Sequence, residues 1–404
     1  SENTAMKYES WGWKVVTIDG HDHEQIRKAL SDANAETERP TLIIGKTIMG
    51  KGCVTTDGSP YEGYTELHGK PIGDTGADYE KTLLNLGADV ANPFDIYSKV
   101  EEYYEGIINK KKDEAQAKKK EIDAWRSENV ELSAKLDGFL EGKLPNLDFS
   151  SIEQKDGQAT RAASSNVLAY LAQNVENMIV SSADLSNSDK TDGFLKKTHI
   201  LKKGDFSGAF LQAGVAELTM TAMANGIALH GGVIPVVATF FVFSDYMKPA
   251  IRLSCIQELP VKFVWTHDAF RVGEDGPTHQ PIEQEAQIRL LEKLKNHSHE
   301  QSFVALRPAD SQETNVAWKM AMENTKTPTG LILSRQGIKD VPAKSGNRYE
   351  EALGAEKGGY LVQEVADPDV ILIANGSEVA TLVAATKLLE EKEGLKVNIA
   401  SIPS

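Results

Sequence analysis

The sequence predicts an α/β protein whose mainly parallel sheets are covered by helices on both faces. Three observations support this class: short apolar runs bounded by turn residues, helical stretches between those runs, and a globular composition with 40% hydrophobic and 25% charged residues. At roughly 100 to 200 residues per domain, a chain of 404 residues corresponds to two to four domains.

Charge and composition exclude several classes of function. Lys and Arg number 44 and Asp and Glu number 59, so the formal net charge is −15 and a nucleic acid is an unfavourable partner. No apolar run approaches the ~20 residues that span a bilayer, so we expect no membrane segment and no membrane partner. Two cysteines are too few for a disulfide framework, and a cytoplasmic protein is therefore expected.

The first 137 residues predict a partial α/β unit followed by a long helix. Apolar runs at 15–18 and 40–44 indicate strands, and Asp22 is a suitable N-cap for a helix between them. A polar, glycine-rich stretch over 55–81 is long enough to be a binding loop. Residues 94–136 predict a helix whose lysine runs alternate with acids, which is typical of a solvated surface.

A linker over 138–158 is expected before a middle domain, 159–338. Apolar strands recur in that domain between helical stretches, which predicts a parallel sheet. The predicted strands are 178–182, 233–241, 261–266, 303–307 and 330–334.

The last segment, 339–404, opens with a polar stretch up to residue 358 that we interpret as a second linker. A strand over 370–374, a helix to about residue 392 and a strand from 398 then form one βαβ unit. Such a unit is too small to be a domain by itself, so we expect it to be the beginning of a larger one.

The densest group of reactive side chains follows the strand that ends at Thr266. His267 and Asp268 come next, and a glycine-rich loop then carries Asp275 and His279. Ligands bind at the carboxyl ends of strands in open α/β sheets, so this position favours a site. The spacing of the histidines matches no common zinc pattern, and a structural role for them is an equally good interpretation.

Glu217 and an aromatic set are further candidates. Glu217 has apolar neighbours, and a carboxyl buried among them would suit a proton-donating role. It also begins a helical run, where a carboxylate is favoured simply by the helix dipole. Phe240, Phe243 and Tyr246 recur every three residues at a strand-to-helix transition, which is more typical of a core than of a cofactor pocket. Each signal is weak alone.

In their order along the chain, these segments strongly resemble the transketolase family. The most specific motif is Gly273-Glu274-Asp275-Gly276-Pro277-Thr278-His279-Gln280-Pro281, within which related deoxyxylulose-phosphate synthases usually differ. Other matching motifs are Gly214-Val215-Ala216-Glu217, Thr239-Phe240-Phe241-Val242-Phe243, Arg307-Pro308-Ala309-Asp310 and Leu333-Ser334-Arg335-Gln336. The resemblance implies a thiamine-diphosphate-binding fold with three domains, of which only the middle one is complete here.

The resemblance implies thiamine diphosphate as cofactor and assigns residues to it. Glu217 matches the family glutamate that hydrogen-bonds the aminopyrimidine ring, and Phe240, Phe243 and Tyr246 match the aromatic pocket around that ring. Asp184, in the matching Ser182-Ala183-Asp184-Leu185 segment, is expected to contact the cofactor as well.

The resemblance also implies a catalytic set and a substrate site. The catalytic set is Glu217, His267, His279 and His68, the last near the cofactor's diphosphate. The donor sugar and its phosphate are expected to contact Arg161, Ser188, His267, Asp275, His279 and Arg335.

The implied activity is the reversible transfer of a two-carbon ketol unit from a ketose phosphate to an aldose phosphate, in the pentose phosphate pathway. Family members are homodimers that use Mg2+ or Ca2+, held by a Gly-Asp-Gly motif that does not occur in this sequence. We therefore expect no metal ligand in this chain, interpret it as lacking both ends of the family architecture, and expect it to be inactive alone. A dihydroxyacetone synthase-like ketol transferase and a non-catalytic transketolase-like partner subunit remain the alternatives.

Overall fold

The computed structural model describes residues 2–269 and 271–404. The chain forms two compact units, the first ending at Ile122 and the second beginning at Asp123. Within the described residues, no helix is both long and apolar enough to cross a membrane. The domain boundaries expected from the sequence stay predictions.

The first unit contains a two-stranded parallel sheet. Both predicted strands and the helix between them are confirmed, with α1 (Thr4–Ser10), β1 (Lys14–Asp19), α2 (His23–Ala35) and β2 (Thr41–Lys46). The carboxylate of Asp22 caps α2, accepting the backbone N–H groups of Glu24 at 2.9 Å and Gln25 at 3.2 Å. The stretch predicted as a loop contains only short turns before α3, namely η1 (Thr65–Leu67), η2 (Ile72–Asp74) and α3 (Tyr79–Asn85).

The predicted helix over 94–136 is two helices, α4 (Ser98–Glu128) and α5 (Val130–Leu140). The chain leaves helical geometry at Asn129, where φ is −127° and ψ is 56°. Arg126 then closes the corner by binding both carboxylate oxygens of Asp137, at 2.6 and 2.8 Å. Sequence periodicity could not reveal this corner because charged residues continue through it.

The second unit is built on a six-stranded sheet in the order β4-β3-β5-β6-β8-β7, in which every neighbouring pair is parallel. All five predicted strands are confirmed within one or two residues, and a three-residue strand, β4, was missed. The strands are β3 (Met178–Ser182), β4 (Phe210–Gln212), β5 (Ile234–Phe240), β6 (Lys262–Thr266), β7 (Val304–Leu306) and β8 (Thr329–Leu333).

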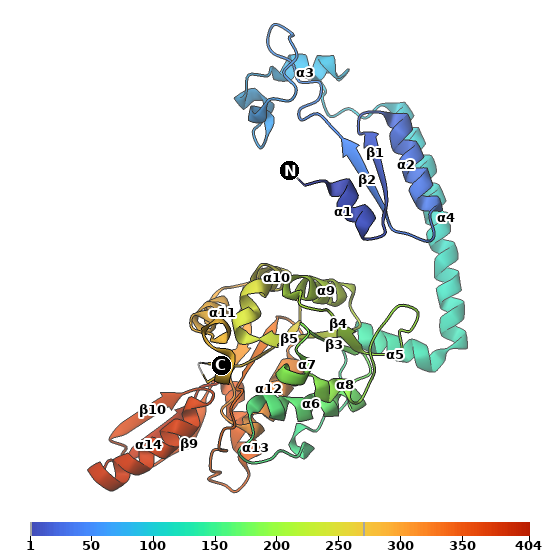
Figure 1. Ribbon diagram of the computed structural model, residues 1–404. Helices are drawn as coiled ribbons and strands as arrows, with labels where there is room; N and C mark the ends of the chain where they lie inside the picture. The colour runs from blue at the N-terminus through green and yellow to red at the C-terminus, as the bar shows by residue number, and fades with distance from the viewer. Residues whose placement is uncertain (1, 270) are drawn as a thin grey trace. The chain divides into compact units, whose positions relative to one another are not determined.

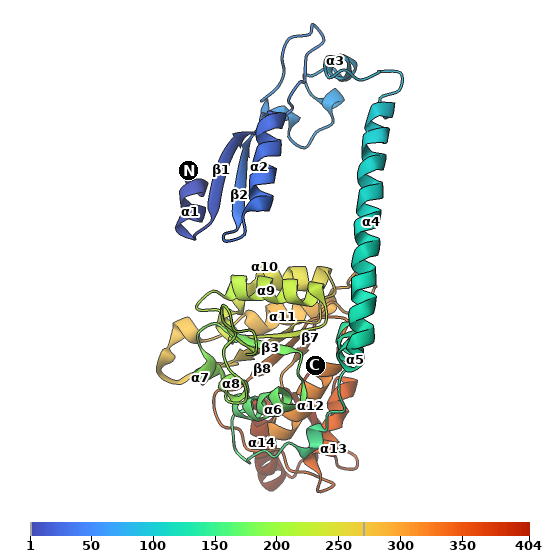
Figure 2. The ribbon, with the colours of Figure 1, turned by 90° about the vertical axis from the view of Figure 1, so that its right-hand side faces the viewer.

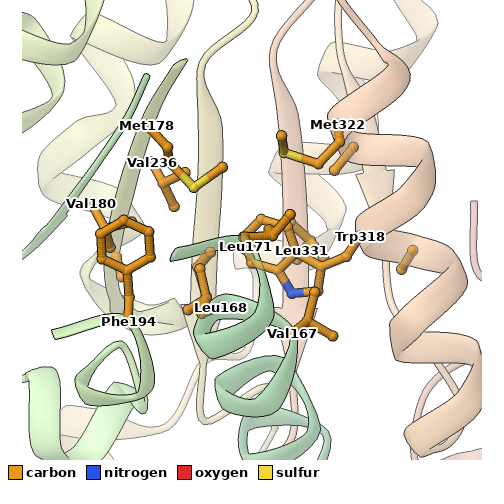
Figure 3. Close-up of a cluster of buried hydrophobic side chains, with 14 of the residues drawn as sticks. Val167, Leu168, Leu171, Met178, Val180, Phe194, Val236, Trp318, Met322 and Leu331 are labelled. Carbon is orange, nitrogen blue, oxygen red and sulfur yellow. The ribbon is translucent and has the colours of Figure 1, made fainter. Parts of the chain in front are cut away.

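Helices cover both faces of this sheet (Figures 1 and 2). One face carries α6 (Thr160–Asn174) and α12 (Ser311–Glu323), and the other carries α9 (Glu217–His230), α10 (Ser244–Ile256) and α11 (Gln284–Lys293). Figure 3 shows the core beneath α6 and α12, where Trp318, Leu171 and Phe194 pack against strand residues. The short helices α7 (Ser186–Asp189) and α8 (Asp192–Leu195) follow β3.

The stretch predicted as a linker, 138–158, is not free chain. It contains η3 (Phe149–Ser151), and Phe149 and Ile152 are buried in the core beneath α6 and α12. The amide of Asn315 on α12 donates to the carbonyl oxygens of both residues, at 3.3 and 3.2 Å. The segment therefore belongs to the packing of the second unit.

The C-terminal segment adds a second, three-stranded sheet to this unit, in the order β10-β11-β9. The predicted βαβ unit is confirmed, with β10 and β11 parallel, whereas β9 was missed and pairs antiparallel with β11. The polar stretch before residue 358, which we interpreted as a second linker, contains two short helical elements, α13 and η7. The elements are α13 (Arg348–Ala352), η7 (Leu353–Lys357), β9 (Tyr360–Gln363), β10 (Val370–Ala374), α14 (Glu378–Glu393) and β11 (Val397–Ser401).

Candidate functional site

The carboxyl ends of β5, β6 and β8 meet at one edge of the six-stranded sheet. Phe240 pairs in register with Thr266, and Thr266 with Leu333, so these three strands end side by side. The loops that leave them carry Phe243, His267 and Arg335, which lie far apart in the sequence. Parallel pairing thus gathers the candidate residues at the edge where α/β sheets bind ligands.

Hydrogen bonds hold the N-terminus of α6 at the same edge of the sheet. Thr160 and Ser334 exchange hydrogen bonds: the N–H of Thr160 donates to Ser334 Oγ at 3.0 Å, and the N–H of Ser334 donates to Thr160 Oγ1 at 2.8 Å. Because Arg161 follows Thr160 and Arg335 follows Ser334, this exchange holds the two arginines in the same neighbourhood. Thr160 was not named from the sequence, and Ser334 was named only within a matching motif, because an isolated hydroxyl carries no signal.

Arg161 and Arg335 form a cationic pair. Burial, together with the positive charge of Arg335, lowers the pKa of Arg161. Arg161 Nη1 donates to the backbone oxygen of Ser188 at 2.7 Å and lies 3.4 Å from its Oγ. The nearest ion-pair partner of Arg335 is Glu274 at 3.7 Å, whose side chain is 88% exposed. Two like charges so weakly compensated favour an anion between them.

Gly273 permits the position of Arg335. Its φ is +82°, and a Cβ there would lie 2.9 Å from the Arg335 guanidinium. A side chain at 273 would therefore displace the guanidinium from the site. Asp275, in the same turn, η5 (Gly273–Asp275), is exposed and acts on Arg161 as an opposite charge.

His267 lies beside Arg161 of the cationic pair and is 1% exposed. Its backbone is left-handed, with φ at +62°, a conformation uncommon for residues other than glycine and enriched at functional sites. The ring nitrogens lie 2.9 Å from Thr266 Oγ1 and 3.4 Å from Arg161 Nη1. Burial, with the charges of Arg161 and Arg335, lowers the pKa of His267 to about 3, so the ring is neutral near pH 7.

Aromatic side chains form a ledge beside His267. The rings of Phe240 and Phe243 stack with centroids 5.8 Å apart, and Phe243 and Tyr246 stack at 6.0 Å. Phe240 covers the His267 ring at 3.8 Å, and His279 meets Phe243 edge-on at 5.2 Å. Tyr246 is 61% exposed, so the ledge faces outward and is not simply a core stripe.

Glu217 is the first residue of α9 and is buried, with 8% of its surface exposed. The helix packs on β5 and on α10, which carry the aromatic ledge. Both interpretations left open by the sequence are compatible with this place: the carboxyl stands at a helix N-terminus and is also held out of bulk water. Its role stays a prediction.

The roles expected for two further residues, His68 and Asp184, stay predictions. His68 follows η1 in the first unit and is exposed. Asp184 follows β3 in a left-handed conformation, with φ at +64°, and is exposed. In the part of the chain that the structure describes, no three His, Cys, Asp or Glu side chains cluster closely enough to hold a metal ion.

Models of three transketolase domain families match the chain in succession. They are the thiamine diphosphate binding domain over residues 1–145, the pyrimidine binding domain over 156–340 and the transketolase-like C-terminal domain over 358–404. The chain belongs to the transketolase family.

Alignments with individual transketolases cover the full length of this chain. It is 37% identical to transketolase of Geobacillus stearothermophilus over 413 aligned residues and 36% identical to that of Bacillus subtilis over 415. Among solved structures, transketolase from Leishmania mexicana matches with a TM-score of 0.87 at 30% identity, and a complex of the Pichia stipitis transketolase with sedoheptulose 7-phosphate matches at 0.85 and 32%.

The alignments cover all of this chain but only part of its relatives. The chain spans 58% of the length of each of these two bacterial transketolases and 57% of each of the two solved chains. The parallel α/β architecture predicted from the sequence is confirmed as the thiamine-diphosphate-binding fold of the family.

Proposed function

We propose that the protein containing this chain is a transketolase, which moves a two-carbon ketol unit between sugar phosphates with thiamine diphosphate. The observation that carries the proposal is the cationic pair of Arg161 and Arg335 beside the aromatic ledge, at the carboxyl edge of a parallel sheet. An arginine fork suits the oxygens of a phosphate ester, and flat rings suit a pyrimidine.

The residues present fit the pyrimidine half of thiamine diphosphate. Phe243 and Tyr246 offer a stacked surface that is open at Tyr246, and Glu217 supplies a buried carboxyl on the neighbouring helix. When bound, thiamine diphosphate supplies the nucleophilic carbon and the electron sink needed to break a bond beside a ketone. Phe240, Phe243 and Tyr246 would flank the ring, and Glu217 would hold a hydrogen bond to one of its nitrogens.

The remaining residues orient the sugar phosphate. Arg161 and Arg335 bind its phosphate together with the hydroxyl of Ser188, and these contacts set the distance from the phosphate to the reacting end. His267 is uncharged near pH 7, so it takes part as a neutral hydrogen-bonding group rather than as an acid. His279, at the rim of the ledge, and Asp275 would meet the sugar hydroxyls.

The wider properties of the family are proposed for the intact protein: Mg2+ or Ca2+ with the cofactor, a homodimer, and a cytoplasmic place in the pentose phosphate pathway. The homodimer is supported by exposed apolar side chains on two adjacent helices, α9 and α10. They are Leu218, Met223 and Leu229 on α9, and Tyr246, Leu253 and Ile256 on α10.

The test uses the full-length protein with xylulose 5-phosphate as donor and either ribose 5-phosphate or formaldehyde as acceptor. Cofactor-dependent formation of a seven-carbon ketose phosphate supports the proposal. Transfer to formaldehyde alone would favour a dihydroxyacetone synthase, and no transfer with either acceptor would leave the partner-subunit alternative. Calorimetry on residues 1–404 alone is expected to detect no tight, magnesium-dependent binding of thiamine diphosphate.

A further inference from the structure

Arg307 directly follows β7 and is 6% exposed. Its guanidinium donates from Nε at 3.1 Å and from Nη2 at 2.8 Å to the same oxygen of Asp268, Oδ2. Asp268 is 5% exposed, and burial raises the pKa of its carboxyl while Arg307 opposes that rise. Removing the guanidinium would leave a buried carboxylate without its counter-charge, which is strongly unfavourable.

This ion pair fixes the turn that carries His267. On one side of His267, Thr266 is held in the sheet by its pairing with Phe240 and Leu333. On the other side, Asp268 is held by Arg307. A left-handed histidine backbone is intrinsically unfavourable and persists only where the surrounding structure determines it. Arg307 therefore supplies one of the two anchors that keep the imidazole beneath Phe240.

The same arginine is bound by the C-terminal segment. Its Nη1 donates to Asn375 Oδ1 at 2.8 Å and lies 2.8 Å from Glu378 Oε2, at the start of α14. Its backbone N–H donates to the carbonyl oxygen of Pro403 at 2.8 Å, and its own carbonyl oxygen accepts the N–H of Gly376 at 3.0 Å. Side chain and backbone of Arg307 thus join the loop after β6 to the segment that contains β10 and β11.

We propose that Arg307 is a positioning residue for the reaction, holding His267 in place through Asp268, and that the C-terminal segment contributes to the site by holding Arg307. The proposal rests on the proposed function for its catalytic meaning, but the structural link can be measured without substrate or cofactor. It assigns a task to Asn375 and Glu378, which were not among the residues that the sequence placed at the site.

The test follows the ring nitrogens of His267 by 1H–15N spectroscopy of histidine-labelled protein between pH 5 and 8. In the wild-type protein the ring should not titrate in this range, because its pKa is about 3. Two variants should release the turn: Arg307→Met, and the double variant Asn375→Ala/Glu378→Ala. In each, the pKa of His267 should rise into this range, towards the ~6.5 of an exposed histidine. The groups acting on this titration are Arg161, Arg335 and His279, all unchanged in these variants.

The matched control is Glu390→Ala, because Glu390 lies on α14, as Glu378 does, and accepts a surface hydrogen bond from Gln363. Its His267 signals should equal those of the wild type. A folded Asn375→Ala/Glu378→Ala protein whose His267 still does not titrate overturns the proposal. If Arg307→Met fails to fold, that double variant alone decides.

In the full-length enzyme, Arg307→Lys should lower kcat by about 10²-fold, the size of effect that a displaced reacting group produces. Its KM for sugar phosphates should change much less, because Arg161 and Arg335 remain. An equal effect on both constants would contradict a positioning role. Absence of any ketol transfer in the wild type would count against the proposed function and leave the spectroscopic result standing.

Discussion

Lys262 offers a sharp test of how burial acts on charge in this fold. It begins β6, is 2% exposed, and its ammonium donates to the backbone oxygen of Asn324. No carboxylate among residues 2–269 and 271–404 lies within ion-pair distance of it. Burial lowers the pKa of Lys262 from 10.5 to about 7.

The size of the effect on the free energy of unfolding follows from this shift in pKa. At ~1.4 kcal/mol per pH unit, the lowered pKa corresponds to about 5 kcal/mol of folding free energy lost at and below pH 7. Between about pH 7 and 10.5 the unfolded chain keeps the proton and the folded chain does not, so stability rises with pH in that window. Lys262→Met removes the charge but leaves the backbone oxygen of Asn324 without a hydrogen bond, which costs ~1–3 kcal/mol of folding free energy. We therefore expect Lys262→Met to be roughly 2–4 kcal/mol more stable at pH 7.

The assay is urea unfolding followed through the fluorescence of Trp265 and Trp318, which are buried on opposite faces of the sheet. Measurements at pH 6, 7, 8 and 9 should show a stability difference that is greatest at or below pH 7 and shrinks by ~1.4 kcal/mol per unit above it. Lys326→Met is the control, since that side chain is 71% exposed and pairs with Glu300 at the surface. A variant no more stable than the wild type, or a pH-independent difference, would refute the reasoning.

Three further outcomes are expected. In the full-length enzyme, Arg335→Ala should raise the KM for phosphorylated sugars by roughly 10- to 100-fold, since a charged hydrogen bond contributes ~1.5–3 kcal/mol, and should lower kcat less; an equal loss with unphosphorylated sugars would show that Arg335 is no phosphate ligand. Glu217→Asp shortens the side chain by one methylene and should greatly lower kcat even at saturating thiamine diphosphate; an unchanged kcat would remove Glu217 from cofactor activation. Inorganic phosphate, added to histidine-labelled protein at constant pH, should raise the pKa of His267, because it offsets the charges of Arg161 and Arg335 that help to lower it; His267 signals that stay the same up to saturating phosphate would contradict this.

The main strands were predictable because buried parallel strands are continuous apolar runs between turn residues. β3 and β10 match their predicted limits, and α2 begins where Asp22 supplies its cap. β4 and β9 were missed because three or four residues carry too little pattern, and their pairing is decided by distant strands. The break between α4 and α5 is accompanied by an ion pair, Arg126 with Asp137, that forms only after the chain turns.

The residues of the candidate site could be predicted from motifs, whereas their burial and protonation states could not. The motif order led to His267, but not to its burial or its neutrality, which arise from Phe240 above it and two arginines beside it. Arg307 was recognised as part of a motif, but its role could not be predicted. Its partners Asp268 and Asn375 come close to it only in the folded protein. Contacts between three loops that are separate in the sequence cannot be predicted from local composition.

The two outermost strands of the six-stranded sheet, β4 and β7, are each only three residues long. An exposed strand edge is a template on which another chain can add a strand, and short edges offer few backbone groups for that. Aggregation by sheet extension is thereby discouraged although the sheet interior is strongly apolar.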